Sequence, residues 1–245
     1  IGAAVLMTFL TSDFSDSLYI IPQQILEGVN KPSLAAVPFF IMAGNLMNVV
    51  GMTDRIFNFA NSLVGHFKAG LAQVNVLSSM IFAGVSGAAV ADCAGLGAIE
   101  IKAMKERGYK PEFAAAVTVC SAVVGPIIPP SIGLVIFAFL AQQSVERMFL
   151  AGMIPGIIIG LSLMLFNRLL AIKHNFPTQK KASSKEVISS AWDGILALVA
   201  PGIILGSILG GFVTATEAGV LACVYSMMLG LFYKTLNFSN LWKAL

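Results

Sequence analysis

Asp92 is the only carboxylate that the sequence places deep within an apolar run. The residues before it, Ala83 to Ala91, are mostly small and include Ser86 and Gly87. An ionisable side chain inside a membrane segment is a candidate for ion or substrate binding, and a serine hydroxyl adds an oxygen ligand. The alternatives are an aspartate that caps a helix and a simple tight turn at Ser86 and Gly87. We take Asp92, Ser86 and Gly87 as candidate binding residues.

A second candidate group lies in the apolar run 113–145, which the stretch 125–131 (GPIIPPS) interrupts. Three prolines in this stretch remove backbone donors and clash with the preceding turn, so the helix must break there. The break predicts two half-helices, whose N-termini suit an anion and whose free carbonyls suit a small cation. A packing kink is the alternative. The candidate residues of this group are Thr118, Ser121, Gly125, Pro126, Pro129, Pro130 and Ser131.

The composition places both groups in a membrane. Hydrophobic residues make up 57% of the 245 positions and charged residues 11%, whereas soluble domains carry about 25% charged residues. The mean hydropathy is +0.86. A net charge of +3 is too small to indicate a nucleic-acid partner. The sequence therefore predicts an all-α polytopic membrane protein in contact with the lipid bilayer.

The distribution of basic residues predicts the direction of each span. Most of the uncharged runs are long enough to be transmembrane helices. If the runs other than 69–91 alternate in direction, all of the 15 lysines and arginines except Lys31 and Arg147 lie on the cytoplasmic side, as the positive-inside rule predicts. The uncharged runs are 32–53, 69–91, 113–145, 148–167, 194–216 and 218–233.

This topology requires a re-entrant hairpin between Lys68 and Lys102. Both residues lie on the cytoplasmic side, and 33 residues separate them. Two full spans need about 40 residues plus a turn, so the segment 69–101 must enter and leave the membrane by the same face. Its tip falls in the glycine-containing stretch near Ser86. Non-helical backbone at this depth is tolerated only where protein buries it or where it lines a watery cavity, which favours a binding site.

The chain divides into four predicted parts. Residues 1–68 hold N-terminal transmembrane helices and an amphipathic interfacial helix over 55–68, and residues 69–145 form the transport-site unit. A transmembrane helix and a basic cytoplasmic linker follow over 146–189, and two further transmembrane helices over 190–245. Glu217, after Thr214, is expected to cap a helix at the outer turn. The run 1–12 is too short to span, and we interpret it as the end of a first helix whose start is missing.

Several stretches resemble the large permease subunit of tripartite ATP-independent periplasmic (TRAP) transporters, the DctM-like family. The resemblance covers essentially the whole chain, with the motifs in the same order. It implies an elevator-type fold of inverted repeats in the bacterial inner membrane, of which this chain holds one repeat, with the second following Leu245. The stretches are 37–48 (VPFFIMAGNLMN), 84–92 (GVSGAAVAD), 113–118 (FAAAVT), 125–131 (GPIIPPS) and 212–218 (FVTATEA).

The resemblance also implies a function and partners. Family members couple the uptake of organic acids to sodium, work with a small four-helix membrane subunit and receive substrate from a periplasmic binding protein. By resemblance, Ser86, Gly87 and Ala88 at the tip and Gly125, Pro126 and Ser131 at the break form a sodium site beside the substrate. Ala88 stands where the family often has a second serine, so a side-chain ligand is lost there. Sodium is the coupling ion, and no other cofactor is expected.

Other functions remain distinguishable. A carboxylate transporter without a binding protein is the main alternative, and an ion channel would need a continuous polar pore instead of one isolated site. A purely structural subunit would not need a broken helix that faces a hairpin tip. An intramembrane aspartyl protease would need a second carboxylate near Asp92, and we expect none at that depth. The sequence therefore predicts a transporter and not an enzyme.

Overall fold

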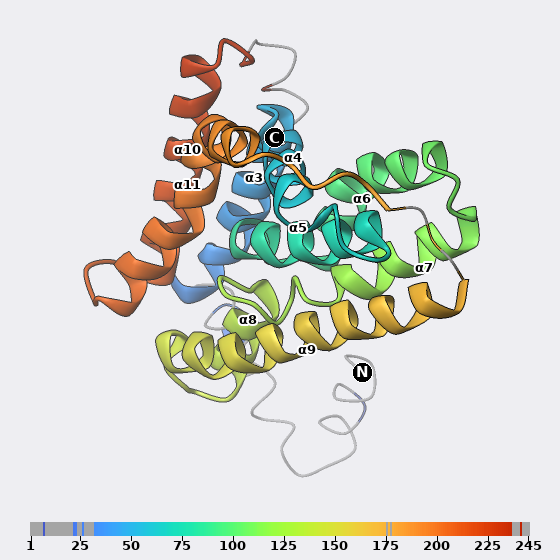
Figure 1. The fold of residues 1–245 in the computed structure, drawn as a ribbon. Coiled ribbons are helices and arrows are strands. Elements are labelled where there is room, and N and C mark those ends of the chain that lie inside the picture. The colour runs from blue at the N-terminus through green and yellow to red at the C-terminus, as the bar shows by residue number, and fades with distance from the viewer. Residues whose placement is uncertain are drawn as a thin grey trace.

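The computed structural model describes residues 32–174, 176 and 178–236, together with residues 7, 22–23, 26 and 241. The described part is helical and contains no strand, which confirms the predicted all-α class (Figure 1). The predicted start of the chain, 1–12, lies outside the described residues except for Met7. The elements are η2 (Pro32–Ala35), α3 (Ala36–Val49), α4 (Met52–Val64), α5 (Gly70–Ser86), α6 (Ala89–Glu106), α7 (Pro111–Ala122), α8 (Ile132–Leu140), α9 (Val145–His174), α10 (Ser184–Leu209) and α11 (Ala215–Phe232).

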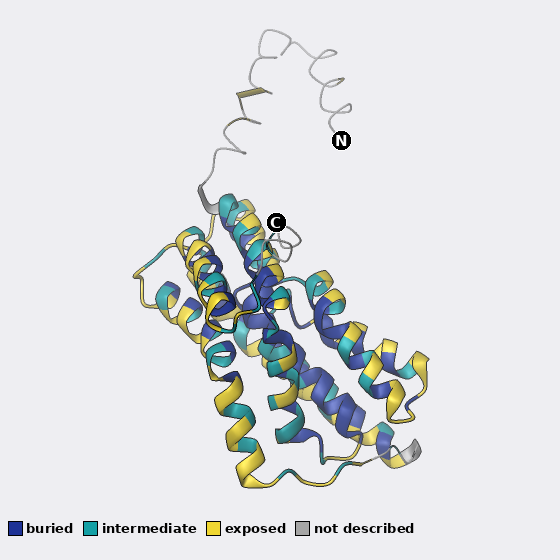
Figure 2. Ribbon diagram, turned by 90° about the horizontal axis from the view of Figure 1, so that it is seen from above, coloured by how far each residue is buried: buried dark blue, intermediate teal, exposed yellow. Residues whose placement is uncertain are grey.

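Three described helices are long and apolar enough to cross a membrane: α9 over Val145–Ile172, α10 and α11. The pair α3 and α4 passes the same test together but is bent by 71°. Exposed residues lie mainly on the outer helices, while the inner ones are buried (Figure 2). The exposed residues of α9 include Ile154, Leu161 and Leu165, an apolar face suited to lipid. The polytopic prediction is therefore confirmed.

Helix α5 is the centre of the structure. It lies among α4, α6, α7 and α9 (Figure 1), and 14 of its 17 residues are buried. Seventeen residues rise about 25 Å, which is less than the roughly 30 Å thickness of a hydrocarbon core. The helix folds back at its end into α6, as predicted for a hairpin. A short central helix that protein covers on all sides can hold polar groups at membrane depth.

The bend between α3 and α4 is made at Gly51, whose φ of 78° glycine adopts without a steric penalty. After this turn α4 buries one side through Ile56, Ala60 and Val64. The predicted amphipathic helix over 55–68 is therefore present, but it begins at Met52 and ends at Val64.

Helix α10 begins six residues before the predicted boundary at 190. The linker was predicted to run through 189 because its residues are polar and basic, yet the chain is helical from Ser184. Ser183 and Glu186 form a capping box, which supplies partners for the first amides of a helix. The expected cap at Glu217 is confirmed, since the Glu217 amide donates to Thr214 Oγ1 and the Thr214 amide donates to Glu217 Oε2.

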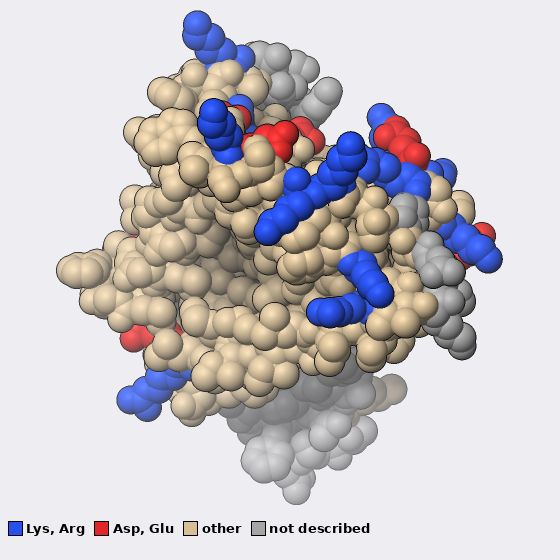
Figure 3. Space-filling view, in the orientation of Figure 1, with Lys and Arg blue, Asp and Glu red and all other residues tan. Residues whose placement is uncertain are grey.

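Charged side chains gather at the edges of the molecule. Lysines and arginines cluster over the upper and right parts of the face in Figure 3, and a few charged side chains lie at its lower left, with an uncharged region between them. Helix α9 extends beyond the predicted run 148–167, because Arg168 ends the uncharged run without ending the helix. Its 30 residues rise about 45 Å, more than a perpendicular crossing needs, and long basic side chains can reach the interface from such a helix.

Candidate functional site

The hairpin tip is formed by Ser86, Gly87 and Ala88. Helix α5 ends at Ser86, and Gly87 follows with a left-handed φ of 60°. Its amide donates to the Ala83 carbonyl at 3.2 Å, which is a common way for glycine to end a helix. Ala88 is extended, with φ −141° and ψ 126°, and α6 begins at Ala89. The chain therefore reverses within two residues.

The broken helix lies opposite this tip. Helix α7 ends at Ala122 and α8 begins at Ile132, so the chain is not helical over 123–131. The break predicted from the prolines is confirmed. Ser131 caps α8: its hydroxyl oxygen accepts from the Leu134 amide at 3.2 Å and donates to the Pro126 carbonyl at 2.5 Å.

The tip and the break are in direct contact. The Ile132 amide donates to the Gly87 carbonyl at 3.2 Å. A Cβ atom added at Gly87 would lie 2.5 Å from the Pro130 carbonyl oxygen. A Cβ atom added at Gly125 would lie 3.4 Å from the Ala88 carbonyl carbon, which is an ordinary contact distance, so the close approach requires glycine at Gly87.

Pro129 extends the same contact along α5. Its carbonyl oxygen lies 3.7 Å from the position of a Cβ atom at Gly84, one turn before Gly87. The structure therefore gathers the tip residues and the residues of the break, which lie far apart in the sequence, around one place inside the molecule.

Ser86 and Ser131 differ in how their hydroxyl groups are used. Both side chains are buried, with 1% and 0% exposed. The Ser86 hydroxyl has no hydrogen-bond partner among the described residues, whereas the Ser131 hydroxyl has two. A buried polar group normally has a partner, so the Ser86 oxygen is the more available ligand.

Thr118 and Ser121 lie in a buried network between α7 and α5. Asn75 Nδ2 donates to Thr118 Oγ1 at 2.7 Å, and Ser121 Oγ donates to Asn75 Oδ1 at 2.5 Å. Ser79 Oγ donates to Ser121 Oγ at 3.2 Å. These two candidate residues therefore connect the broken helix to the central helix α5. The network fixes the position of α7, which leads into the break.

Asp92 lies in the first turn of α6 with 1% of its surface exposed. Neither carboxylate oxygen has a hydrogen-bond partner among the described residues, so the capping interpretation is not supported. Ser79 is the polar side chain beside it. An unpartnered buried carboxylate is costly, and it is a strong candidate to attract a cation.

Glu100 is a functional candidate that the sequence analysis missed. It is 1% exposed, and both of its carboxylate oxygens lack a partner among the described residues. It interacts electrostatically with Asp92, two turns earlier on α6. Helical rise separates the two residues by about 12 Å along α6, so Glu100 is a second buried carboxylate of the hairpin but does not lie at the depth of Asp92. Spacing was the available signal, because residues four apart share a helix face and the buried residues of α6 include Asp92, Leu96, Glu100 and Met104.

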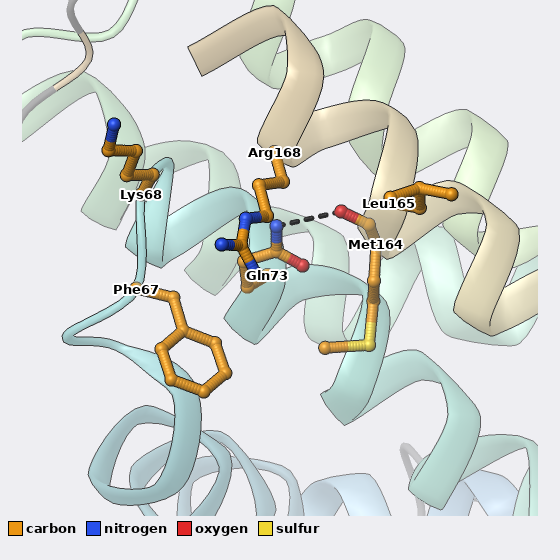
Figure 4. A pocket seen from close by; sticks show the side chains of 6 residues that line it. All are labelled: Phe67, Lys68, Gln73, Met164, Leu165 and Arg168. Carbon is orange, nitrogen blue, oxygen red and sulfur yellow. Dashed lines mark hydrogen bonds between the residues drawn. The ribbon is translucent and has the colours of Figure 1, made fainter. Parts of the chain in front are cut away.

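A cavity of about 370 Å³ lies between the start of α5 and helix α9, away from the tip (Figure 4). Gln73 Nε2 donates to the Met164 carbonyl oxygen at 2.8 Å, which joins the two helices. Lys68 and Arg168 also line the cavity, but the Lys68 ammonium group points away from the Arg168 guanidinium group in Figure 4. The two charges therefore do not converge on one ligand.

The whole chain, residues 1–245, matches the family described as tripartite ATP-independent periplasmic transporter, DctM component. It is 40% identical over 242 residues to the sialic acid TRAP transporter large permease protein SiaM of Vibrio cholerae. It is 40% identical over 223 residues to the sialic acid TRAP transporter permease protein SiaT of Haemophilus influenzae. The C4-dicarboxylate TRAP transporter large permease protein DctM of Pseudomonas aeruginosa is 36% identical over 231 residues.

These alignments cover 98%, 91% and 94% of this chain, but only 57%, 36% and 54% of the respective relatives. The chain thus spans about half the length of the relatives, or less. The relatives are named as transporter permeases and not as enzymes, in agreement with the expected family. With the motifs, the helical architecture and the match of the full chain in agreement, the chain belongs to the DctM family, the large permease component of tripartite ATP-independent periplasmic transporters.

Proposed function

We propose that this chain provides one half of the transport site of a sodium-coupled importer of organic acids. The observation that carries the proposal is the contact between the hairpin tip and the broken helix, with the buried, unpartnered hydroxyl of Ser86 at its edge. Irregular backbone of this kind is tolerated inside a membrane where it forms a site. Two such elements in contact are the arrangement from which many secondary transporters build their binding sites.

The cation would be held by oxygen atoms from both elements. Ser86 supplies a free hydroxyl oxygen, and Ser131 has one lone pair left after its two hydrogen bonds. Gly87 and Gly125 lie where the backbones of the tip and the break come together, so their carbonyl oxygens could take part. Ala88 has no side-chain oxygen, so only its carbonyl could take part. Asp92 supplies negative charge from the first turn of α6.

The substrate would bind beside this cation as an anion. Helices α6 and α8 begin at the same contact, at Ala89 and Ile132. Helix N-termini carry partial positive charge and favour carboxylates. The α6 N-terminus has no side-chain cap, which leaves its amides available. Relatives named for sialic acid and C4-dicarboxylates support a carboxylate substrate.

Family membership supports the remaining parts of the proposal. The complete transporter would include a second repeat, a small four-helix membrane subunit and a periplasmic binding protein that delivers substrate. Movement of the site across the membrane by an elevator mechanism belongs to the same proposal. Thr118 and Ser121 would hold α7 in place through their network with α5.

The test is uptake of a panel of labelled organic acids by proteoliposomes. These would contain the complete large subunit, its small partner and the cognate binding protein, with and without a sodium gradient. We expect uptake of at least one acid only when both sodium and the binding protein are present. Ser86→Ala should raise the sodium concentration for half-maximal uptake by about 10- to 100-fold, the usual cost of disturbing an ion site.

Ser162→Ala is the matched control, because Ser162 is an exposed serine of α9 that donates to the Ile158 carbonyl. It should leave the sodium dependence unchanged. Sodium-dependent uptake without the binding protein would favour the alternative carboxylate transporter. Equal sodium dependence in Ser86→Ala and Ser162→Ala would remove Ser86 from the site.

A further inference from the structure

Glu100 is buried between α6 and α5, toward the cytoplasmic end of the hairpin. Both carboxylate oxygens are enclosed without a hydrogen-bond partner among the described residues. Ser78 of α5 is the polar side chain beside it. Glu100 lies two turns along α6 from Asp92, so it is separate from the proposed site at the tip. Nothing in the proposed sodium or substrate site accounts for it.

The charges around Glu100 do not neutralise it. Helices α3, α4, α5 and α7 pack against α6, and α3 and α5 carry no charged residue. The Arg55 guanidinium of α4 lies over the Tyr233 ring at 3.8 Å, on the side of α11. The exposed or half-buried ionisable residues of α4, α6 and α7 are Asp54, Arg55, Cys93, Lys102, Lys105, Glu106, Glu112 and Cys120.

The hydrogen bond of Ser78 shows which form of Glu100 fits. A serine hydroxyl has one proton to donate and two lone pairs to accept. The Ser78 hydroxyl donates to the Val74 carbonyl, so only lone pairs remain for Glu100. Lone pairs repel a carboxylate but accept a hydrogen bond from a carboxylic acid.

Electrostatic repulsion also favours the protonated form of Glu100. Two carboxylates that share a low-dielectric region do not both ionise readily, and a buried charge without a partner is strongly unfavourable. An ionised Asp92 therefore favours the neutral form of Glu100. A proton requires no cavity, whereas a metal cation would need several further oxygen ligands.

We propose that Glu100 is a proton-binding site within the hairpin, at which a carboxyl oxygen takes a proton from water and donates it as a hydrogen bond to the Ser78 hydroxyl. The hairpin then carries a bound proton in addition to any ion at its tip. Because Asp92 and Glu100 interact, the occupancy of the tip and the protonation of Glu100 are coupled.

The test is infrared spectroscopy of the purified complex of the complete large subunit with its small partner, which does not depend on transport. We expect the carbonyl stretching band of a protonated carboxyl group at neutral pH, and we expect alkaline pH to remove it. Glu100→Gln should abolish the band. Glu106→Gln, which changes an exposed carboxylate six residues later on the same helix, should leave it in place.

Ser78→Ala keeps the carboxyl group but removes its acceptor, so it should shift the band without removing it. This variant decides the question even if Glu100→Gln fails to fold. An identical band in the native complex and in Glu100→Gln, or no shift in Ser78→Ala, would overturn the proposal. A carboxyl band that appears only when sodium is removed would also overturn it, because Glu100 would then be a sodium ligand.

Discussion

Two serines of the same contact differ in how their hydroxyl groups are hydrogen-bonded. The Ser131 hydroxyl donates to the Pro126 carbonyl and accepts from the Leu134 amide. These two hydrogen bonds fix the start of α8. Ser86 is equally buried but has no partner among the described residues. A buried hydroxyl without a hydrogen bond costs free energy. A ligand that binds the Ser86 oxygen would remove this cost.

Ser121 provides a residue-level test of the network between α5 and α7. Ser121→Ala removes the donor to Asn75 Oδ1 and leaves a buried acceptor unpaired. We expect a loss of about 1–3 kcal/mol of stability, measured as a lower melting temperature of the purified complex. The control, Ser190→Ala, removes a bond from Ser190 to Glu186 near the exposed start of α10 and should cost less. An equal melting temperature for Ser121→Ala and the native complex would contradict the structural role of this network.

At the scale of elements, the hairpin and the broken helix form one unit because glycine occurs where backbones meet. Gly87 combines a left-handed φ with a Pro130 carbonyl oxygen where its Cβ atom would be. A Cβ atom at Gly125 would be in ordinary contact with the Ala88 backbone. Any side chain at Gly87 must therefore push the tip away from the break, which would open the proposed site.

Gly87→Ala compared with Gly51→Ala isolates this effect. Both glycines have a positive φ, but nothing lies within 4 Å of the Cβ position at Gly51. A left-handed alanine costs about 1–2 kcal/mol, so Gly51→Ala should lower the melting temperature by that strain alone. Gly87→Ala should lower it further and abolish sodium-dependent uptake. Similar losses in the two variants would show that the tip and the break are not tightly docked.

At the scale of the whole molecule, basic residues and chain reversal together predict the orientation in the membrane. Arg55 of α4 donates to the Asp193 carbonyl of α10 at 3.2 Å and stacks on Tyr233 after α11, so three elements far apart in the sequence meet at one end. The loop after α6 carries Arg107 and Lys110. The positive-inside rule assigns both places to the cytoplasm.

Cysteine labelling tests this orientation. In a variant of the complete subunit without native cysteines, Lys68→Cys and Glu106→Cys should react with a membrane-impermeant maleimide only after the inner membrane is opened. Gln143→Cys, in the turn between α8 and α9, should react from the periplasmic side. Reaction of Lys68→Cys and Glu106→Cys from opposite sides would show that the hairpin spans the membrane and does not re-enter.

The main elements could be predicted from the sequence because their causes are local. Prolines 126, 129 and 130 cannot continue a helix, glycine permits the reversal at Gly87, and the spacing between Lys68 and Lys102 is too short for two spans. The cap at Thr214 and Glu217 was found in the same way. The equivalent signal at Ser183 and Glu186 lies in a polar, basic stretch that predicts a linker, so the predicted start of α10 is too late.

Tertiary structure alone decided how these elements use their polar residues. Glu100 lies two residues before Lys102, where the sequence predicts an interfacial charge, but the helices packed against α6 bury it. No local pattern predicts that Asn75 pairs with Thr118 and Ser121, because they lie more than 40 positions away. These residues share hydrogen bonds because α5 and α7 lie side by side. Burial depends on what covers a residue, and the covering helices come from distant parts of the chain. The sequence by itself therefore determined the hairpin, the break and the membrane setting, and the packing of helices determined which serine is free and which carboxylates are enclosed.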